Sequence, residues 1–282
     1  MHYRVILPTP ALSNYLECFW TLQSRSTPSL LSPERILPDG CTEIIFNLAA
    51  AFKRYHSSNH VEVQPQSLFV GQMRRFAMIE PTGEVRLFGI RFRPAGAYIF
   101  THFPLAELTD KIIDLDLIWN HFSRELTEKI HLARTTHERT NIVEKALLAR
   151  LDRRHDIDRI IESAIDTIIA RDGLVSIDRL QKKLQLSSRQ LERKFQERVG
   201  LSPKFFCRIL RLQKVFKAVA SHRPLHWSFI ATECGYFDQA HFIHDFKEFS
   251  GQTPAIYFSE AHEMSEHFTR KNRLSDFYNT NE

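Results

Sequence analysis

The spacing of hydrophobic residues changes near residue 104 and divides the chain into two parts. Before it, short β-prone runs (IIFNL, SLFVG and EVRLFGIRF) are separated by the turn signals PDG and PTG. In the last run, apolar side chains occupy every second position, at Phe88, Ile90 and Phe92, which is the period of a strand with one buried face. Residues 1–104 are therefore predicted to form a β-rich domain, a small barrel or sandwich.

After residue 104 the apolar positions recur every three or four residues, which is typical of amphipathic helices. The first predicted helix carries its apolar stripe at Leu115, Ile118, Trp119, Phe122, Leu126 and Ile130. A second helix is expected from about Asn141 to Leu151, with an apolar face made of Ile142, Leu147, Leu148 and Leu151. Residues 105–154 are interpreted as a helical linker and a candidate dimerisation element.

The rest of the chain is predicted to be an all-α domain over 155–260, followed by a tail over 261–282 with little periodicity. The domain contains an internal repeat: LSSRQLERKFQERVGLSP (186–203) matches FDQAHFIHDFKEFSGQTP (237–254) at an offset of 51 residues without a gap. The fold class is therefore α+β, with a β-rich first domain and a helical second domain that contains one motif twice.

Each matched position of the repeat has a physical role. Ser187 and Asp238 are favoured N-cap residues, and Ser187 forms a capping box with Gln190. Gly200 and Gly251 stand where a helix ends in a left-handed residue. A short helix precedes each copy, so the sequence predicts two helix-turn-helix units.

A helical wheel separates the two faces of each second helix. With Leu191 and Phe195 in the core, the first copy turns Arg189, Arg193 and Glu197 outward. In the second copy the outward side chains are Ala240, His244, Lys247 and Glu248, with His241 at the flank. These side chains are the ones expected to enter a DNA major groove, where arginine pairs with guanine.

The charge distribution agrees with a polyanion-binding C-terminal domain. Residues 1–171 hold 21 Lys and Arg against 20 Asp and Glu, whereas residues 172–258 hold 14 against 8. The basic excess therefore lies where the two helix-turn-helix units are predicted, as electrostatic attraction to DNA requires.

The C-terminal residues resemble the AraC/XylS family of bacterial transcription regulators. The resemblance covers about residues 158–258 and is carried by L-x-L-S-x-x-x-L-x-R-x-F, GLSPKFFCRILRL and CGYFDQAHFIHDFKEFSGQTP. It implies a seven-helix DNA-binding domain with a connecting helix from Pro203 to about Ala220. It also implies base contacts by Arg189, Gln190, Arg193, Gln239, His241 and His244. Phosphate or positioning contacts are expected from Ser187, Ser188, Lys194, Lys204, Arg208, Arg211 and Lys247.

One position departs from the family. Members often have arginine where this chain has His244, so contact there is expected to be weaker and pH-dependent. Gln190 also has a second interpretation, because as a member of the capping box it can serve the helix end instead of a base.

The N-terminal part resembles, more loosely, regulatory domains attached to some AraC-like proteins. LPDGCTEIIFNL (37–48) and LFGIRFRPAGAY (87–98) carry this resemblance. It implies a cupin-like or barrel-like domain that senses a small effector or dimerises. Arg91 and Arg93 are interpreted either as facing an anionic effector or as the polar outer face of a strand.

Metal chemistry is not predicted. His241 and His244 form an H-x-x-H pair on one helix, but a third ligand is missing and the H-E-x-x-H motif is absent. His56 and His60 are expected to be solvated loop residues with no carboxylate nearby. The four cysteines, none in a C-x-x-C pair, are expected to be buried hydrophobes: Cys18, Cys41, Cys207 and Cys234.

The chain is predicted to be a DNA-binding regulator and not an enzyme, with no cofactor. The alternative is a DNA-repair or enzyme fusion with an auxiliary helix-turn-helix domain, but the P-C-x-R nucleophile of alkyl-transferring relatives, P-loops and G-x-G-x-x-G loops are absent. The expected partners are double-stranded DNA, a small-molecule effector, a second copy of the chain and, for an activator, RNA polymerase. With no signal peptide and no long apolar run, a bacterial cytoplasmic location without membrane partners is expected.

Overall fold

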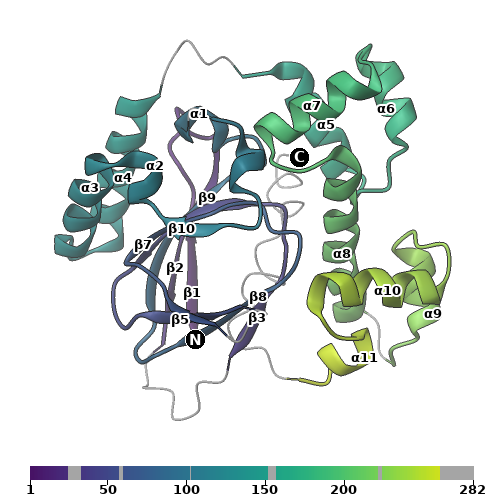
Figure 1. The fold of residues 1–282 in the computed structure, drawn as a ribbon, viewed down its shortest axis with the longest axis horizontal. Coiled ribbons are helices and arrows are strands. Elements are labelled where there is room, and N and C mark those ends of the chain that lie inside the picture. Colours follow the sequence, from purple (N-terminus) through teal and green to yellow (C-terminus); the bar gives the residue numbers. More distant parts are fainter. Residues whose placement is uncertain (25–32, 57–59, 102, 152–156, 222–223, 261–282) are drawn as a thin grey trace.

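The computed structural model describes residues 1–24, 33–56, 60–101, 103–151, 157–221 and 224–260. Two antiparallel sheets form the N-terminal part (Figure 1). The larger sheet has the order β1-β2-β9-β4-β7-β10, made of His2–Ile6, Leu16–Gln23, Arg86–Phe92, Thr42–Asn47, Ser67–Val70 and Ile112–Asp114. The smaller sheet has the order β3-β8-β5-β6, made of Glu34–Ile36, Ala77–Pro81, Phe52–Tyr55 and Val61–Val63.

The larger sheet is buried on both faces, which differs from the one-sided burial predicted for 84–92. Phe88, Ile90 and Phe92 of β9 pack into one core together with side chains of the helices that follow the sheet. On the other face, Leu87 packs with residues of the smaller sheet in a second core. Arg91 shares that second face and is only 1% exposed, so it is an interior residue and not part of a polar outer face.

On the face of the larger sheet that packs against the smaller sheet, a tryptophan side chain lies directly against the backbone of the neighbouring strand. Trp20 of β2 lies over Gly89 of β9, where an added Cβ would come within 2.0 Å of the indole ring. The indole Nε1 of Trp20 then donates to Glu43 Oε1 at 3.2 Å. Only glycine at position 89 leaves room for this ring.

The helices after the sheet pack on its face and are not a free linker. They are α1 (Tyr98–Thr101), the 3-10 helix η1 (Leu105–Leu108), α2 (Asp116–Trp119), α3 (His121–Leu132) and α4 (Thr136–Arg150). Leu126, Ile130, Val143 and Leu147 are buried in the same core as Phe88. Strand β10, which lies beyond residue 104, also belongs to the larger sheet.

Two details of this region correct the sequence prediction. The single helix expected around 115–130 is broken at Asn120, whose φ of 51° and ψ of −139° are not helical, so that α2 ends before this residue and α3 begins after it. In α4, Val143 and Leu147 face the core, so Leu148 lies on the outer side and is 42% exposed.

Seven helices make up the C-terminal part within the residues described. They are α5 (Arg159–Ile169), α6 (Ile177–Leu184), α7 (Ser188–Arg198), α8 (Pro203–Ser221), α9 (Trp227–Glu233), α10 (Gln239–Ser250) and α11 (Pro254–Tyr257). They share one hydrophobic core. None of the described helices is long and apolar enough to span a membrane. The expected tail over 261–282 and most of the expected boundary around 153–158 lie outside the described residues.

In Figure 1 the larger sheet and its helices lie to the left of α8, whereas α5, α6 and α7 lie at the upper end of α8 and α9, α10 and α11 at its lower end. Leu37 and Cys41 of the N-terminal part belong to the C-terminal hydrophobic core. The Gln213 Nε2 of α8 donates to the Pro38 carbonyl at 2.7 Å. The two parts are therefore packed together through buried groups.

Candidate nucleic-acid interface

Helix α7 is held by its apolar face and by its first turn. Leu191 and Phe195 are fully buried in the C-terminal core. At the N-terminus, the Gln190 backbone N–H donates to Ser187 Oγ at 3.3 Å, and the Ser187 backbone N–H donates to Gln190 Oε1 at 2.9 Å. This reciprocal pair is the predicted capping box. The side-chain carbonyl oxygen of Gln190 is therefore used in the cap of α7.

Helix α10 is positioned in the same way by different residues. Phe242, Phe246 and Phe249 are fully buried, and the Asp238 carboxylate accepts from the His241 backbone N–H at 2.7 Å. Gly251 ends the helix with a φ of 76°, and Gly200 has a φ of 87° after α7. Both glycines adopt the left-handed conformation predicted from the repeat.

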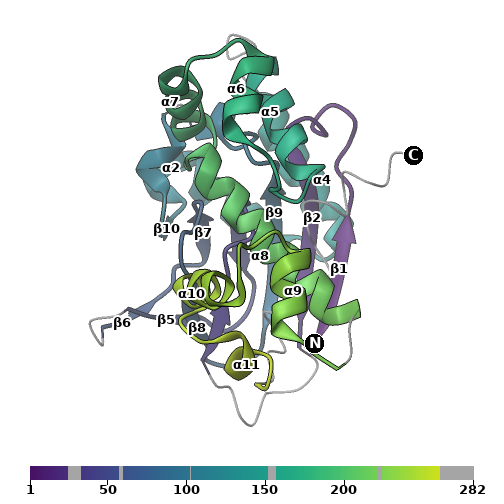
Figure 2. The same ribbon diagram turned by 90° about the vertical axis from the view of Figure 1, so that its right-hand side faces the viewer.

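Helices α7 and α10 lie one above the other along the same edge of the C-terminal part, joined by α8 (Figure 2). Helix α8 has 19 residues, which corresponds to about 28 Å of helix. Helices α7 and α10 are thus held apart on one edge of the domain by a long helix (Figure 2).

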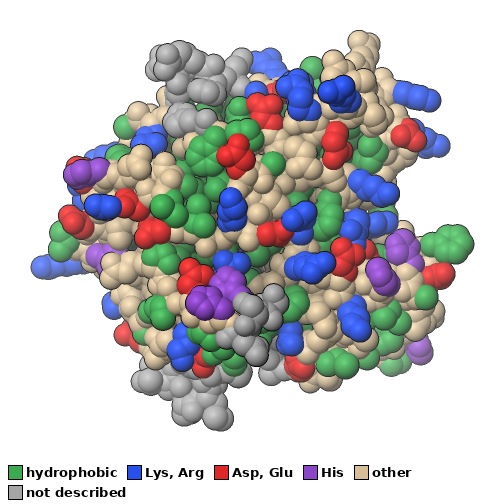
Figure 3. Space-filling model, viewed as in Figure 1, with side chains coloured by type: hydrophobic (Ala, Val, Ile, Leu, Met, Phe, Trp, Pro, Cys, Tyr) green, Lys and Arg blue, Asp and Glu red, His purple; other side chains and the backbone are tan. Residues whose placement is uncertain are grey.

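The side chains predicted to contact bases are exposed at the solvent side of these two helices. Lys, Arg and His side chains gather on the part of the surface formed by them (Figure 3). The exposed residues are Arg189, Gln190 and Arg193 on α7, and Gln239, His241 and His244 on α10. Arg193 remains 69% exposed in its side chain, although its Nη1 lies 3.9 Å from Glu197 Oε2.

The predicted phosphate-contacting residues fall into two groups. Ser187, Ser188, Lys204 and Lys247 are exposed. The other three, Lys194, Arg208 and Arg211, are partly buried and make contacts inside the protein. These residues were expected from their positions in the sequence, and sequence position does not show which charged ends turn back onto neighbouring helices.

Arg208 joins α8 to the buried side of α10. Its Nε donates to Asp245 Oδ1 at 2.9 Å and its Nη2 to Glu248 Oε2 at 2.6 Å. The guanidinium carbon also lies 4.9 and 5.1 Å from the ring centroids of Phe205 and Phe249, which contact each other edge to face. The hydrogen bond from Arg208 lowers the pKa of Glu248 below its usual value. Glu248, expected to face outward, is thus an anchor of α10.

Lys194 and Arg198 anchor α7 to α5 through one carboxylate. Lys194 Nζ pairs with Asp158 Oδ2, and Arg198 Nε lies 3.7 Å from the same oxygen. Asp158 also caps α5 by accepting from the Ile161 backbone N–H at 3.3 Å. Burial opposes ionisation, but the hydrogen bonds from Lys194 and from this N–H lower the pKa of Asp158.

The N-terminal part contacts the C-terminal ends of both helices. Tyr98 donates its hydroxyl to Glu197 Oε1 at 2.8 Å, so Glu197 is held against the other domain instead of facing outward. Thr109 Oγ1 donates to the Gly200 carbonyl at 2.5 Å, and the Phe76 backbone N–H donates to the Phe249 carbonyl at 2.9 Å. Nothing in the sequence pattern indicated these contacts, because the partners are far apart along the chain.

Candidate metal-binding residues do not converge. In the described parts of the chain, no group of three or more His, Cys, Asp and Glu side chains could hold a metal ion. His56 differs from the prediction that it has no carboxylate nearby, since its Nε2 lies 2.9 Å from Glu62 Oε2. All four cysteines are buried and free of disulfides.

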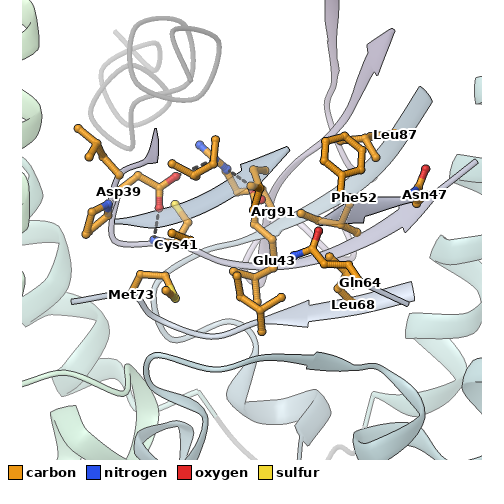
Figure 4. A pocket seen from close by; sticks show the side chains of 18 of the residues that line it. Asp39, Cys41, Glu43, Asn47, Phe52, Gln64, Leu68, Met73, Leu87 and Arg91 are labelled. Atoms are coloured by element: carbon orange, nitrogen blue, oxygen red, sulfur yellow. Dashed lines mark hydrogen bonds and ion pairs between the residues drawn. The ribbon is translucent and has the colours of Figure 1, made fainter. Parts of the chain in front are cut away.

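A cavity of about 90 Å³ lies between the two sheets of the N-terminal part (Figure 4). Most of its wall is apolar, including Phe52, Leu68 and Leu87, and its charged residues are Asp39, Glu43 and Arg91. Arg91 donates from Nε to Glu43 Oε1 at 2.6 Å and from Nη2 to Asp39 Oδ2 at 2.7 Å. Arg93 instead reaches Asp166 of α5 at 3.6 Å.

Two family models match the chain. Residues 180–260 match a helix-turn-helix domain, and residues 4–114 match a domain of unknown function, DUF6597. No curated protein matches by sequence.

Solved structures of ToxT from Vibrio cholerae are similar to this chain over most of its length. One form has 11% identity and a TM-score of 0.46, covering 86% of this chain and 98% of ToxT. A complex with (E)-4-(8-methylnaphthalen-1-yl)but-3-enoic acid has 12% identity and a TM-score of 0.46, with the same coverage. A form with bound unsaturated fatty acid has 11% identity and a TM-score of 0.43, covering 90% and 94%. At these values the likeness supports no conclusion about ligand or activity.

Proposed function

We propose that this chain, whose residues 180–260 are a helix-turn-helix domain of the AraC type, is a sequence-specific transcriptional regulator. In this proposal α7 and α10 enter adjacent major-groove segments of one DNA duplex. The observation that carries it is the placement of two capped helices on the same edge of the domain (Figure 2). Exposed Arg, Gln and His side chains on both helices supply the hydrogen-bonding groups that base edges require.

The roles of individual residues follow from exposure. Arg189 and Arg193 of α7, with Gln239, His241 and His244 of α10, are assigned to base contacts. Gln190 is assigned to the helix cap first, with its side-chain amide N–H₂ left for DNA. Phosphate contacts are assigned to Ser187, Ser188, Lys204 and Lys247. Lys194, Arg208 and Arg211 are assigned to positioning the helices, because their charged ends face the protein interior.

The N-terminal part is proposed to regulate DNA binding by sensing a small effector. Its interior cavity and its hydrogen bonds to the ends of α7 and α10 support this role. Dimerisation through 105–151 is proposed as a second role, because Leu117, Leu132 and Leu148 are exposed there. If the chain activates transcription, RNA polymerase is a further partner.

The proposal is tested by selecting binding sites for the full chain from randomised duplex DNA. We expect one enriched motif with two segments about one helical turn apart, and affinity that falls as salt increases. No enriched motif and no salt dependence would contradict the proposal.

A matched pair of variants tests the residue roles. Arg193→Ala is expected to relax preference at one base, at a cost of about 1–3 kcal/mol for the preferred sequence. Lys204→Ala is expected to weaken binding to all sequences by the same factor and to reduce the salt dependence. Equal effects of the two variants on every sequence would refute the assignment of Arg193 to base readout.

A further inference from the structure

The cavity between the two sheets has an apolar wall and one charged end. Residues from both sheets line it, among them Ile45, Phe52, Leu68, Ile79 and Leu87. The charged side chains Asp39, Glu43 and Arg91 meet at one end (Figure 4). A volume of about 90 Å³ can hold several water molecules, which need roughly 10–15 Å³ each on the same measure. The space therefore suits a small ligand with an apolar body.

The charged end carries more negative than positive charge. Two carboxylates face one guanidinium, and no other Asp, Glu, Lys or Arg is among the lining residues that the structure describes. Both carboxylates are largely buried, at 18% and 10% side-chain exposure for Asp39 and Glu43. A buried carboxylate is stable only when its charge is compensated. A third carboxyl group, Glu17, lies next to the cluster, but burial raises its pKa to about 8, so it is mostly protonated near neutral pH. One further positive charge would therefore balance Asp39, Glu43 and Arg91.

The guanidinium of Arg91 is already occupied. Its Nε and Nη2 donate to Glu43 and Asp39 at 2.6 and 2.7 Å, and its side chain is 1% exposed. An anionic ligand would have to displace one of these carboxylates and would add a second uncompensated negative charge. The geometry thus disfavours a carboxylate ligand and favours a cation. Burial raises the pKa of Glu43, and the neighbouring charge of Asp39 adds to this rise, so a cation beside Glu43 would stabilise its ionised form.

The charged end is also connected to the DNA-binding part. Residues 37–41 form one wall of the cavity, and Leu37 and Cys41 in this segment are packed in the C-terminal core. The Pro38 carbonyl accepts from Gln213 Nε2 of α8 at 2.7 Å, and Gln213 is 5% exposed. A ligand that changes the Asp39–Arg91 pair therefore acts on a segment that is bonded to the helix joining α7 and α10.

We propose that this cavity binds a small ligand with an apolar body and a single ammonium group, and that residues 37–41 transmit its binding to α8. The ammonium group donates to Asp39 and Glu43, and the apolar body contacts the residues of the two sheets. The transmission to α8 rests on the proposed function, whereas the binding of the amine does not.

The ligand class is tested on the full chain with three probes of the same length: n-hexylamine, 1-hexanol and hexanoate. Isothermal titration is expected to show hexylamine binding at least about tenfold more tightly than the other two, because a hydrogen bond between charged groups is the strongest class available here. Tighter binding of hexanoate, or no binding of any probe at millimolar concentration, would overturn the proposal.

Two variants locate the probe. Asp39→Asn is expected to remove the preference for the amine over the alcohol. Leu68→Trp enlarges a side chain of the apolar wall, changes none of the charged residues, and is expected to abolish binding of hexylamine. If Asp39→Asn does not fold, Leu68→Trp still tests where hexylamine binds, provided that its circular dichroism spectrum matches that of the unmodified chain. Unchanged hexylamine binding in Leu68→Trp would place the probe elsewhere and overturn the site.

The transmission is measured as the change in DNA affinity caused by hexylamine. At least a threefold change is expected in the unmodified chain, and a smaller change in Gln213→Met, which loses the bond to Pro38 but keeps the cavity. Binding of hexylamine with no change in DNA affinity would overturn the transmission alone. Failure of the chain to select any DNA motif would instead count against the proposed function and leave the amine site standing.

Discussion

The two helix-turn-helix units have the same repeat spacing but are built with different turns. In the first unit, residues 185–187 separate α6 from α7, and Gln185 adopts a φ of 54°. In the second, residues 234–238 separate α9 from α10, and Gly235 adopts a φ of 74°. The left-handed residue is therefore strained in the first unit and unstrained in the second.

The ion pairs that anchor the two DNA-facing helices have opposite polarity. In α7 the cation Lys194 lies on the helix and pairs with Asp158 at the start of α5. In α10 the anion Asp245 lies on the helix and pairs with Arg208 of α8. The repeat thus preserves the apolar positions and the caps but not the electrostatic anchors. This comparison explains why two cations predicted to contact phosphate are used inside the protein.

Breaking the anchor of the second unit is expected to have the largest effect on stability. Arg208→Met leaves Asp245, whose side chain is 4% exposed, without its partner, which typically costs about 3–5 kcal/mol. Lys194→Met leaves Asp158 with Arg198 and two backbone N–H groups, so about 1 kcal/mol or less is expected. Urea unfolding of both variants gives the comparison.

The double variant Arg208→Met with Asp245→Leu is the control for this prediction. Because it removes both charges, it is expected to recover most of the stability lost in Arg208→Met. Equal destabilisation by Arg208→Met and Lys194→Met would show that the two anchors do not differ as described.

The two units are also expected to respond to pH in opposite directions. Burial raises the pKa of Glu162, on α5 next to the first unit, to about 7. The folded-state pKa of Glu162 lies above the ordinary value of 4.5. The contribution of Glu162 to the free energy of unfolding is therefore largest below pH 4.5 and is lost as the pH rises through 7. Glu162→Gln should remove this loss, and its stability relative to the unmodified chain should rise by about 1–3 kcal/mol between pH 5 and pH 8.

Glu248 provides the matched measurement in the second unit. Arg208 lowers the pKa of Glu248, so its contribution is present above the ordinary value for glutamate and is lost only in acid. Glu248→Gln should therefore lower stability near neutral pH and have little effect at low pH. If Glu162→Gln and Glu248→Gln changed the free energy of unfolding with the same dependence on pH, the predicted difference between the two glutamates would be wrong.

The repeat made most of the C-terminal architecture predictable from local rules. Ser187, Asp238, Gly200 and Gly251 act through backbone groups only a few residues away, and each is found in the conformation or contact expected of it. The connecting helix was instead implied by the family resemblance, from Pro203 to about Ala220, and α8 spans Pro203–Ser221.

Long-range contacts were not predictable in the same way. Arg91 was interpreted from the alternation within its own strand, but its burial depends on the smaller sheet that covers it. The contact between Tyr98 and Glu197 joins residues 99 positions apart, and no periodicity encodes such a pair. The break at Asn120 was missed because the apolar spacing continues across it.

Exchanging the turn residues tests the difference in backbone strain. Gly235→Ala places a Cβ at a φ of 74° and 2.2 Å from Leu174 Cδ2, so a loss of about 1–2 kcal/mol is expected. Gln185→Gly relieves a left-handed side chain and should raise stability by less than about 1 kcal/mol. Thermal unfolding of the two variants measures both effects. A loss of stability in Gln185→Gly would show that the Gln185 side chain contributes more than its backbone strain costs.

The smallest expected effect concerns the matched DNA-facing positions Arg193 and His244. Arginine offers a permanent positive charge and a planar set of N–H donors, whereas histidine offers fewer donors. His244→Arg should therefore tighten DNA binding by about 0.5–1 kcal/mol. Arg193→His should weaken DNA binding by a similar amount. Because both side chains are exposed, neither change should alter the unfolding temperature. Fluorescence anisotropy on the selected DNA site measures both changes in affinity. The same affinity for His244→Arg and the unmodified chain would mean that residue 244 does not contact DNA.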